Sequence, residues 1–447
     1  MATVEVRDSL LSHEKSLTFL SMELNDASNF EESTVALNAT KCPIQDVEIH
    51  IQTSFLMYSQ QWDHSEREKT KAFIRALGGL KRLKSLSIFG SKISRAAALP
   101  LQFLTEILRN NEIQLERLVL YNLLIFYFNN CLFGTSLQDF LDLFEKQTAL
   151  QEISMVRSQF GAPPPYVLFQ DWCEILSLLP ALQRLRLVYQ RILDDDRLQF
   201  IKTTTYANLV HKSSLRFLEI SNFDTCDRYL DQLLATQAEA DFNQNETRTC
   251  HLEELWLSCR QLRLRGCKAI ARFLPFAPAL HTLHLESQGT LSSSKEAPVH
   301  MDDECVNVLA RALTPLTTTS SSSQSLSKLQ HFWLDGTSVT SLAPFVEMMR
   351  ANCALETFKV IPGTDGLEQD DQESKAWKEN TEIQMLCKLN AAGRYHLLHP
   401  DHCASDSVSS GSSCHQHWIN ALIETNDDVN CSFYLLSLNP LICNINK

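Results

Sequence analysis

The sequence predicts an α/β solenoid with terminal caps, in which a parallel sheet lines the concave side and helices cover the convex side. Three observations lead to this prediction. A short apolar motif recurs along most of the chain, and segments with helical apolar spacing separate its copies. Glycine is also scarce, at 12 of 447 residues. Because glycine-rich turns cradle phosphates in nucleotide-binding folds, this scarcity argues against that class of α/β protein.

The repeated motif has apolar residues at positions 1, 4 and 6, as in Leu83, Leu86 and Ile88. Positions 4 and 6 alternate with a period of two, which is typical of a strand with one buried face. A weaker copy begins at Ile44, and nine clear copies follow at a mean spacing of 34 residues. The clear copies begin at Leu83, Leu115, Leu150, Leu182, Leu215, Leu252, Leu280, Leu329 and Leu355.

Helices are predicted between the strands. Phe73, Ile74 and Leu77 precede the first clear copy with the spacing of one buried helix face, and similar patterns occur at 101–108, 137–144 and 306–313. One strand and one helix cannot bury a core alone, so consecutive units must stack on one another.

Nine copies of the LxxLxL motif resemble the leucine-rich repeat, specifically the helix-containing subtype of ribonuclease inhibitor. The resemblance covers about residues 65 to 362 and implies a horseshoe-shaped solenoid. The family often has Asn or Cys three residues after the last motif leucine. Here that place holds Ser91, Leu123, Ser158 and Gln190, among others, so we expect less regular loops than in the family.

The chain is predicted to have three regions: an N-terminal cap (1–62), the solenoid (63–362) and an acidic linker with a C-terminal helical cap (363–447). The N-terminal cap is expected to be rich in strands, with strand-like runs at 16–24, 34–37 and 47–51. The C-terminal segment is similar to that of some algal leucine-rich-repeat proteins. Its helices are expected to cover the last repeat with Ile383, Leu386, Trp418, Leu422 and Tyr434.

Composition and charge exclude several classes of function. The 40 basic residues are outnumbered by 53 acidic ones, for a net charge of −13, which argues against nucleic-acid binding. The longest apolar run, 118–128, is too short to cross a bilayer. The N-terminus has no secretory signal pattern, and the 14 cysteines are therefore predicted to be reduced thiols. These observations predict an intracellular protein, cytoplasmic or nuclear.

No catalytic or cofactor-binding motif is present, so the sequence predicts neither an enzyme nor a cofactor. One Cys/His-rich stretch has residue types that bind zinc, but it lacks CxxC or HxxxH spacing and is interrupted by a serine-rich run. A polar cap loop without metal is the simpler interpretation. The stretch contains His399, His402, Cys403, Cys414, His415 and His417.

A cluster of basic residues precedes the first clear repeat. Most simply these residues form a solvated face, with a binding patch as the alternative. They are Lys69, Lys71, Arg75, Lys81, Arg82 and Lys84.

The candidate binding site lies on the concave face. Motif position 5 alternates with the buried positions 4 and 6, so its residues form a column across the sheet in which Trp256, His284 and Trp333 are consecutive. A cationic side chain of a protein partner could lie over an indole and pair with a neighbouring carboxylate. The flanking columns add Phe217, Glu254, Glu286, His331 and Asp335.

Two alternatives would hide this site. The C-terminal cap or the insertion at 288–325 could cover the rings, or a register slip of one residue could turn them inward.

The sequence thus predicts a non-catalytic scaffold that binds a protein partner with a basic contact segment. The alternatives are an enzyme regulator, such as a GTPase activator, and a substrate receptor in ubiquitin transfer. The strand-rich N-terminus argues against an F-box, which the last role often uses.

Overall fold

The chain divides into two compact units, Met1–Asp224 (unit 1) and Thr225–Lys447 (unit 2). The computed structural model describes most of the strands and helices of both. The described residues are 19–24, 27–39, 43–51, 64–90, 97–109, 114–126, 137–157, 159–161, 175–188, 209–223, 230, 234, 250–259, 262–287, 301–315, 328–337, 339, 341–362, 375–392, 394, 422–423 and 428–438.

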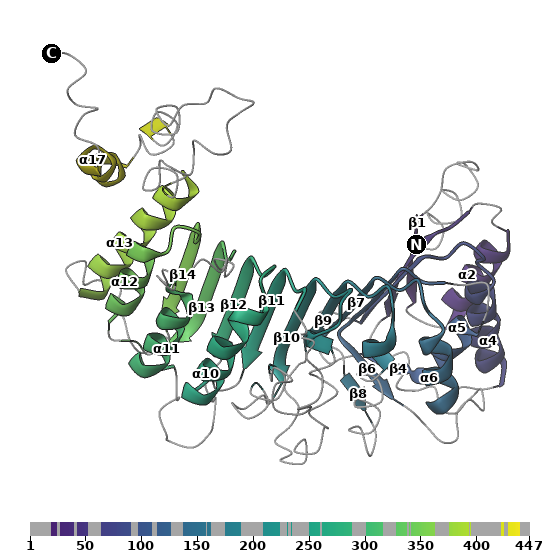
Figure 1. The fold of residues 1–447 in the computed structure, drawn as a ribbon. Helices are drawn as coiled ribbons and strands as arrows, with labels where there is room; N and C mark the ends of the chain where they lie inside the picture. The colour runs from purple at the N-terminus through teal and green to yellow at the C-terminus, as the bar shows by residue number, and fades with distance from the viewer. Residues whose placement is uncertain are drawn as a thin grey trace, which may run out of the picture. The chain divides into compact units, whose positions relative to one another are not determined.

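Parallel strands form the main sheet of unit 1, side by side in chain order (Figure 1). Motif position 4 is in register from strand to strand: Leu86 lies beside Leu118, Leu118 beside Ile153 and Ile153 beside Leu185. The strands are β1 (Phe19–Leu24), β2 (Asp46–Ile51), β3 (Ser85–Gly90), β5 (Arg117–Tyr121), β7 (Glu152–Val156), β9 (Arg184–Val188) and β10 (Phe217–Phe223).

Helices α2 (Ala27–Ala39), α4 (His64–Gly78), α5 (Leu101–Leu108) and α6 (Leu137–Glu145) alternate with strands in unit 1. Each helix packs against the next, and aromatic side chains join the first three. The ring centroids of Phe30 and Phe73 are 5.2 Å apart, and those of Phe73 and Phe103 are 6.4 Å apart. All three rings are buried, so the helices share one continuous core.

A second, three-stranded parallel sheet was not predicted. It consists of β4 (Ala97–Pro100), β6 (Leu123–Phe126) and β8 (Gln159–Gly161). Asn122 and Arg157, which follow β5 and β7, have φ angles of 52° and 51° and turn the chain towards β6 and β8. Leu123, which stands where the family often has Asn or Cys, therefore begins a strand.

Unit 2 repeats the same pattern with β11 (Glu254–Cys259), β12 (Thr282–Ser287), β13 (His331–Thr337) and β14 (Thr357–Pro362). These strands are also parallel and in register, with Leu255 beside Leu283, Leu283 beside Phe332 and Phe332 beside Phe358. The helices are α10 (Leu264–Phe273), α11 (Asp303–Leu313), α12 (Ala343–Ala351), α13 (Lys375–Ala391) and α17 (Val429–Leu438), with the short 3-10 helix η3 (Leu274–Phe276) after α10.

The motif leucines form the core of both units. Leu118 and Leu185 in unit 1 are buried, as are Leu255 and Leu283 in unit 2. A backbone hydrogen-bond pattern recurs just before the strands: the carbonyl of Lys84 accepts from Glu116 and Arg117, and that of Glu116 accepts from Gln151 and Glu152. The predicted α/β fold of stacked strand–helix repeats is confirmed.

Helix α13 packs against α12 and β14 at the end of the repeats in unit 2. Ile383 and Leu386 are buried on it, and the Gln384 amide donates to the Phe358 carbonyl at 2.8 Å. The buried Arg394 guanidinium donates to the carbonyls of Met349 and Arg350, at 3.0 and 2.5 Å. Backbone carbonyls at the end of α12 thus receive partners. Leu422 and Tyr434 are half-buried, and Trp418 lies outside the described residues.

The predicted strand at 34–37 was wrong, because these residues lie in α2. The β-branched pair Thr34–Val35 suggested a strand, but Phe30, Ser33 and Leu37 are the buried positions. That spacing of three and four residues is the buried stripe of a helix. The other two runs contribute strands β1 and β2, which belong to the same parallel sheet as the later repeats.

Candidate functional site

Each sheet has one face towards the helices and an opposite face, which we call the open face. In β11, Leu255 and Leu257 are buried while Trp256 between them is half-exposed; in β12, His284 lies likewise between buried Leu283 and Leu285. The predicted column exists, because Trp256 pairs with His284 and His284 with Trp333 in the sheet register. The alternative of a one-residue register slip is therefore excluded.

Trp256, His284 and Trp333 form a three-ring cluster, here called the aromatic cluster. The ring centroids are 4.9 Å apart for Trp256 and His284, 5.5 Å for His284 and Trp333, and 5.4 Å for the two tryptophans. The interplanar angles of 66°, 88° and 87° are edge-to-face arrangements, which the charge distribution of aromatic rings favours. The three rings hold one another in place on adjacent strands.

The ring of His284 is oriented by Asp335, which lies on β13. Its Nε2 is 3.0 Å from Oδ2 of Asp335, and the two side chains are 20% and 24% exposed. Because two rings and a carboxylate restrain this imidazole, its side-chain entropy is already reduced before any partner binds.

Two further carboxylates, Glu254 on β11 and Glu286 on β12, stand on the same face and are half-exposed. Neither forms a hydrogen bond or an ion pair with any residue that the structure describes. His331 is also half-exposed and begins β13. The structure therefore brings together seven of the eight predicted residues on the strands of unit 2.

Phe217 is the exception. It lies in β10 of unit 1 and is buried, and the guanidinium carbon of Arg184 sits 4.4 Å from its ring centroid. Its face is thus occupied by a cation of the same unit.

The predicted insertion at 288–325 is only partly described. Its residues 303–313 form α11, which packs against α10 and α12 on the helix side of the sheet. Residues 288–300 and 316–327 lie outside the described residues.

Unit 1 has an aromatic row that we did not predict. His50, Phe89 and Tyr121 are neighbours in the sheet register at motif position 7. The rings of His50 and Phe89 stack with centroids 5.1 Å apart, and those of Phe89 and Tyr121 are 6.0 Å apart. Comparing position 7 between successive repeats would have revealed this row, because it alternates with the buried position 6.

Two pairs of charged side chains on the open face of unit 1 form ion pairs with each other. Arg186 Nε lies 2.6 Å from Glu219 Oε2, and Arg117 Nε lies 3.3 Å from Glu152 Oε2. The Glu219 side chain is only 9% exposed, so its charge is compensated within the unit.

The Cys/His-rich stretch lies outside the described residues, which applies to His399, His402, Cys403, Cys414, His415 and His417 alike. Within the described ranges, no group of three or more Cys, His, Asp or Glu side chains could hold a metal ion. None of the described helices is both long and apolar enough to cross a membrane.

Six of the seven cysteines that the structure describes in unit 2 are buried, and Cys353 is half-exposed. Burial raises the pKa of the Cys250 thiol to about 11 and that of Cys387 to about 12. Both thiols stay protonated near neutral pH and are poor nucleophiles. They act as small apolar core residues.

Comparison of the chain with protein-family models gave no match, and comparison with curated proteins gave none either. Fold and site define the chain as an α/β repeat protein with a restrained aromatic cluster on the open face of a parallel sheet.

Proposed function

We propose that this protein is a non-catalytic scaffold of the leucine-rich-repeat type that binds a protein partner on the open face of unit 2. The aromatic cluster is the single observation that carries this proposal. Large aromatic side chains that remain partly exposed on a rigid sheet are typical of binding hot spots.

The assignment to the leucine-rich-repeat type rests on the LxxLxL motif and on strands that keep this motif in register. Parallel strands followed by helices, and the recurring carbonyl that accepts two backbone N–H groups, support it.

The partner is expected to present a basic contact segment. Glu254 and Glu286 provide carboxylates beside the aromatic cluster, and Asp335 adds a third on β13. A Lys or Arg side chain could lie over an indole while its charged group pairs with Glu254 or Glu286. Such an arrangement would combine apolar contact with charge complementarity.

The mechanism we propose is preorganisation. Strands within the sheet fix the backbone, and the T-shaped contacts together with Asp335 restrain the rings. Little additional ordering would then oppose association, which favours affinity for a given contact area.

The proposal is tested with the double variant Trp256→Ala/Trp333→Ala. Partners are first captured with the wild-type protein and identified by mass spectrometry, and the affinity of each purified partner is then measured by calorimetry. We expect the variant to bind about a thousandfold more weakly, because hot-spot residues contribute about 2 kcal/mol or more each. Thermal unfolding shows whether the variant is folded.

The matched control is Phe89→Ala/Tyr121→Ala, which removes two aromatic rings from the open face of unit 1. Affinity should change little in this control. An equal loss of affinity in both variants, or no loss of affinity in Trp256→Ala/Trp333→Ala, would contradict the proposal.

The alternative roles make different predictions. A GTPase activator would raise the rate of GTP hydrolysis by a small GTPase partner, whereas a scaffold would leave it unchanged. A substrate receptor would promote ubiquitin transfer to its partner in a reconstituted reaction. We expect neither effect. We also expect the partner to be a cytoplasmic or nuclear protein.

A further inference from the structure

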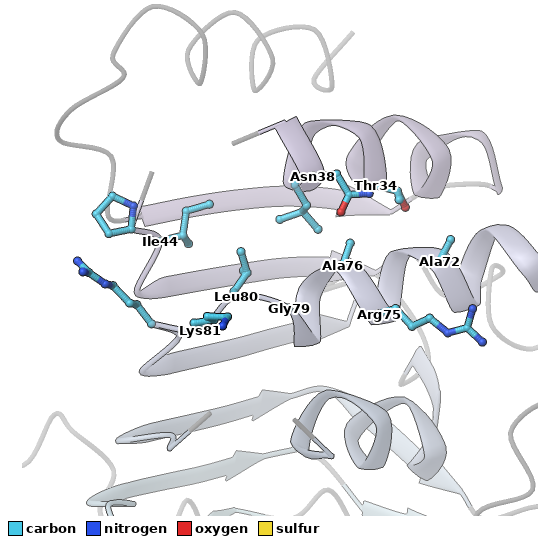
Figure 2. Close-up of a pocket in the computed structure, with 12 residues that line it drawn as sticks. Thr34, Asn38, Ile44, Ala72, Arg75, Ala76, Gly79, Leu80 and Lys81 are labelled. Carbon is cyan, nitrogen blue, oxygen red and sulfur yellow. The ribbon is translucent and has the colours of Figure 1, made fainter. Parts of the chain in front are cut away.

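A groove in unit 1 lies outside the surface described so far. It has a volume of about 770 Å³ and runs between α2 and α4 and over the chain that follows α4. Figure 2 shows Thr34 and Asn38 on α2 across from Ala72 and Ala76 on α4. We call it the α2/α4 groove.

Apolar side chains contribute much of the groove lining. Leu37 and Ile44 are buried, and Leu80 and Ala76 are half-exposed. A volume of this size accommodates a few side chains of a bound molecule, since ligand pockets commonly span about 300–1,000 Å³.

The charge of the lining has one sign. Arg75, Lys81 and Arg82 line the groove, and none of the Asp or Glu residues that the structure describes lines it. This is the opposite of the whole chain, whose net charge is −13. A local cationic surface on an acidic protein selects for an anionic ligand by charge complementarity.

The structure divides the six predicted basic residues into two sets. Three have carboxylate partners: Lys69 pairs with Glu31 at 2.8 Å, Lys71 with Glu68 at 2.8 Å, and Lys84 with Glu116 at 2.7 Å. The remaining three line the groove, and one of them, Lys81, also interacts within the protein. Within the described part of the chain, neither Arg75 nor Arg82 forms an ion pair.

Helix electrostatics explain only part of this arrangement. Arg75 lies in the last turn of α4, where a cation interacts favourably with the helix C-terminus. Arg82 follows the helix, so its position beside the groove has no such cause.

From the apolar lining and the three cations we infer that the α2/α4 groove binds an acidic, amphipathic segment of a partner protein. Leu or Phe side chains of the segment enter the groove over Leu37, Ile44 and Leu80. Its flanking Asp or Glu residues pair with Arg75 and Arg82, whose planar guanidinium groups can hold a carboxylate through two hydrogen bonds. This site is independent of the proposed function, which concerns a basic segment on unit 2.

The test is a selection of random dodecapeptides displayed on phage. The wild-type full-length protein is the bait, and Arg75→Gln/Arg82→Gln is used to remove peptides that bind elsewhere. We expect the enriched peptides to combine Leu or Phe with Asp or Glu. Synthetic copies are then measured by fluorescence anisotropy and should bind the variant about tenfold more weakly, as expected from the loss of two exposed ion pairs.

Two further variants separate the groove from general charge effects. Ala72→Phe introduces bulk at an exposed position of the groove lining without changing charge, and should weaken the same peptides to a similar extent. Arg109→Gln/Lys146→Gln removes two exposed cations elsewhere in unit 1 and should leave binding unchanged.

Several outcomes would overturn the inference. One is that the selection enriches no peptide, or only neutral or basic peptides. Another is that Arg109→Gln/Lys146→Gln weakens peptide binding as much as Arg75→Gln/Arg82→Gln does. Competition by millimolar inorganic phosphate, by a DNA oligonucleotide or by vesicles containing phosphatidylserine would instead indicate a simple anion, nucleic-acid or membrane site. Since none of these experiments involves the aromatic cluster, their failure leaves the proposed function standing.

Discussion

The open faces of the two units are built alike but differ in how their charges are used. Both carry a row of aromatic rings that includes a histidine, namely His50, Phe89 and Tyr121 in unit 1 and the aromatic cluster in unit 2. In unit 1, Arg186 pairs with Glu219 and Arg117 pairs with Glu152.

In unit 2, Glu254 and Glu286 have no such partner among the described residues. The repeat thus determines where side chains point, whereas the identity of each side chain decides whether the charges of a face pair with one another or are available to a partner. Four predictions probe the two units, beginning with the largest effect.

Because the two units share one repeat pattern, truncating equivalent core leucines should lower the stability of each unit by a similar amount. Leu118→Ala in unit 1 and Leu283→Ala in unit 2 should each destabilise their unit by about 2–5 kcal/mol, because both leucines are buried at motif position 4. Hydrogen exchange followed by mass spectrometry reports each unit separately. A large loss of protection in only one unit would show that the repeats of the two units are not equivalent.

Truncating a glutamate should have different effects on the two faces. Glu219→Ala should lower the free energy of unfolding of unit 1 by about 1 kcal/mol, because it removes the ion pair with Arg186 and the packing of a nearly buried side chain. Glu254→Ala should change the stability of unit 2 by no more than about 0.5 kcal/mol. Denaturant titrations of the two variants provide the measurement, and similar losses would remove the distinction between the faces.

For binding of the partner, substitutions in unit 2 should have the larger effect and those in unit 1 the smaller. Glu254→Gln/Glu286→Gln should weaken a captured basic partner about three- to tenfold, chiefly through slower association, and should reduce the dependence of binding on salt. Arg117→Gln/Glu152→Gln, which neutralises an ion pair of unit 1 without changing net charge, is the control. Stopped-flow or surface-plasmon measurements would distinguish these outcomes. A control variant that binds the partner as weakly as Glu254→Gln/Glu286→Gln would count against the proposed surface.

The smallest predicted effect is an acid sensitivity of unit 2. The backbone N–H of Cys305 donates to Asp302 at 2.9 Å, and this bond holds the pKa of Asp302 below its ordinary value of 3.8. A lowered pKa stabilises the folded state above pH 3.8, and the contribution is lost as the pH falls through the folded-state pKa.

Asp302→Asn retains an acceptor for the cap of α11 but no longer titrates. It should abolish this part of the pH dependence, which we expect to be about 1 kcal/mol or less. Unfolding of both proteins is compared at pH values above and below 3.8. An unchanged acid dependence would assign the sensitivity to other groups.

The repeat and its register were predictable because they depend on local alternation. The spacing of Leu255 and Leu257 is enough to place Trp256 on the open face, and the positions of His284 and Trp333 follow from the same motif. The strand predicted at 34–37 failed because β-branched residues suggested a local preference that burial of Phe30, Ser33 and Leu37 overrides.

The amino-acid sequence by itself determined the strand–helix alternation, the phase of each strand and the column to which each side chain belongs, because these follow from short-range periodicity. Only the tertiary structure decided which charges meet. Glu219 pairs with Arg186 from the preceding repeat, and Lys69 and Lys84 find carboxylates on neighbouring elements while Arg75 and Arg82 line a groove. Such pairings join residues on neighbouring elements, and a side chain's partner across that distance depends on packing that no local pattern encodes.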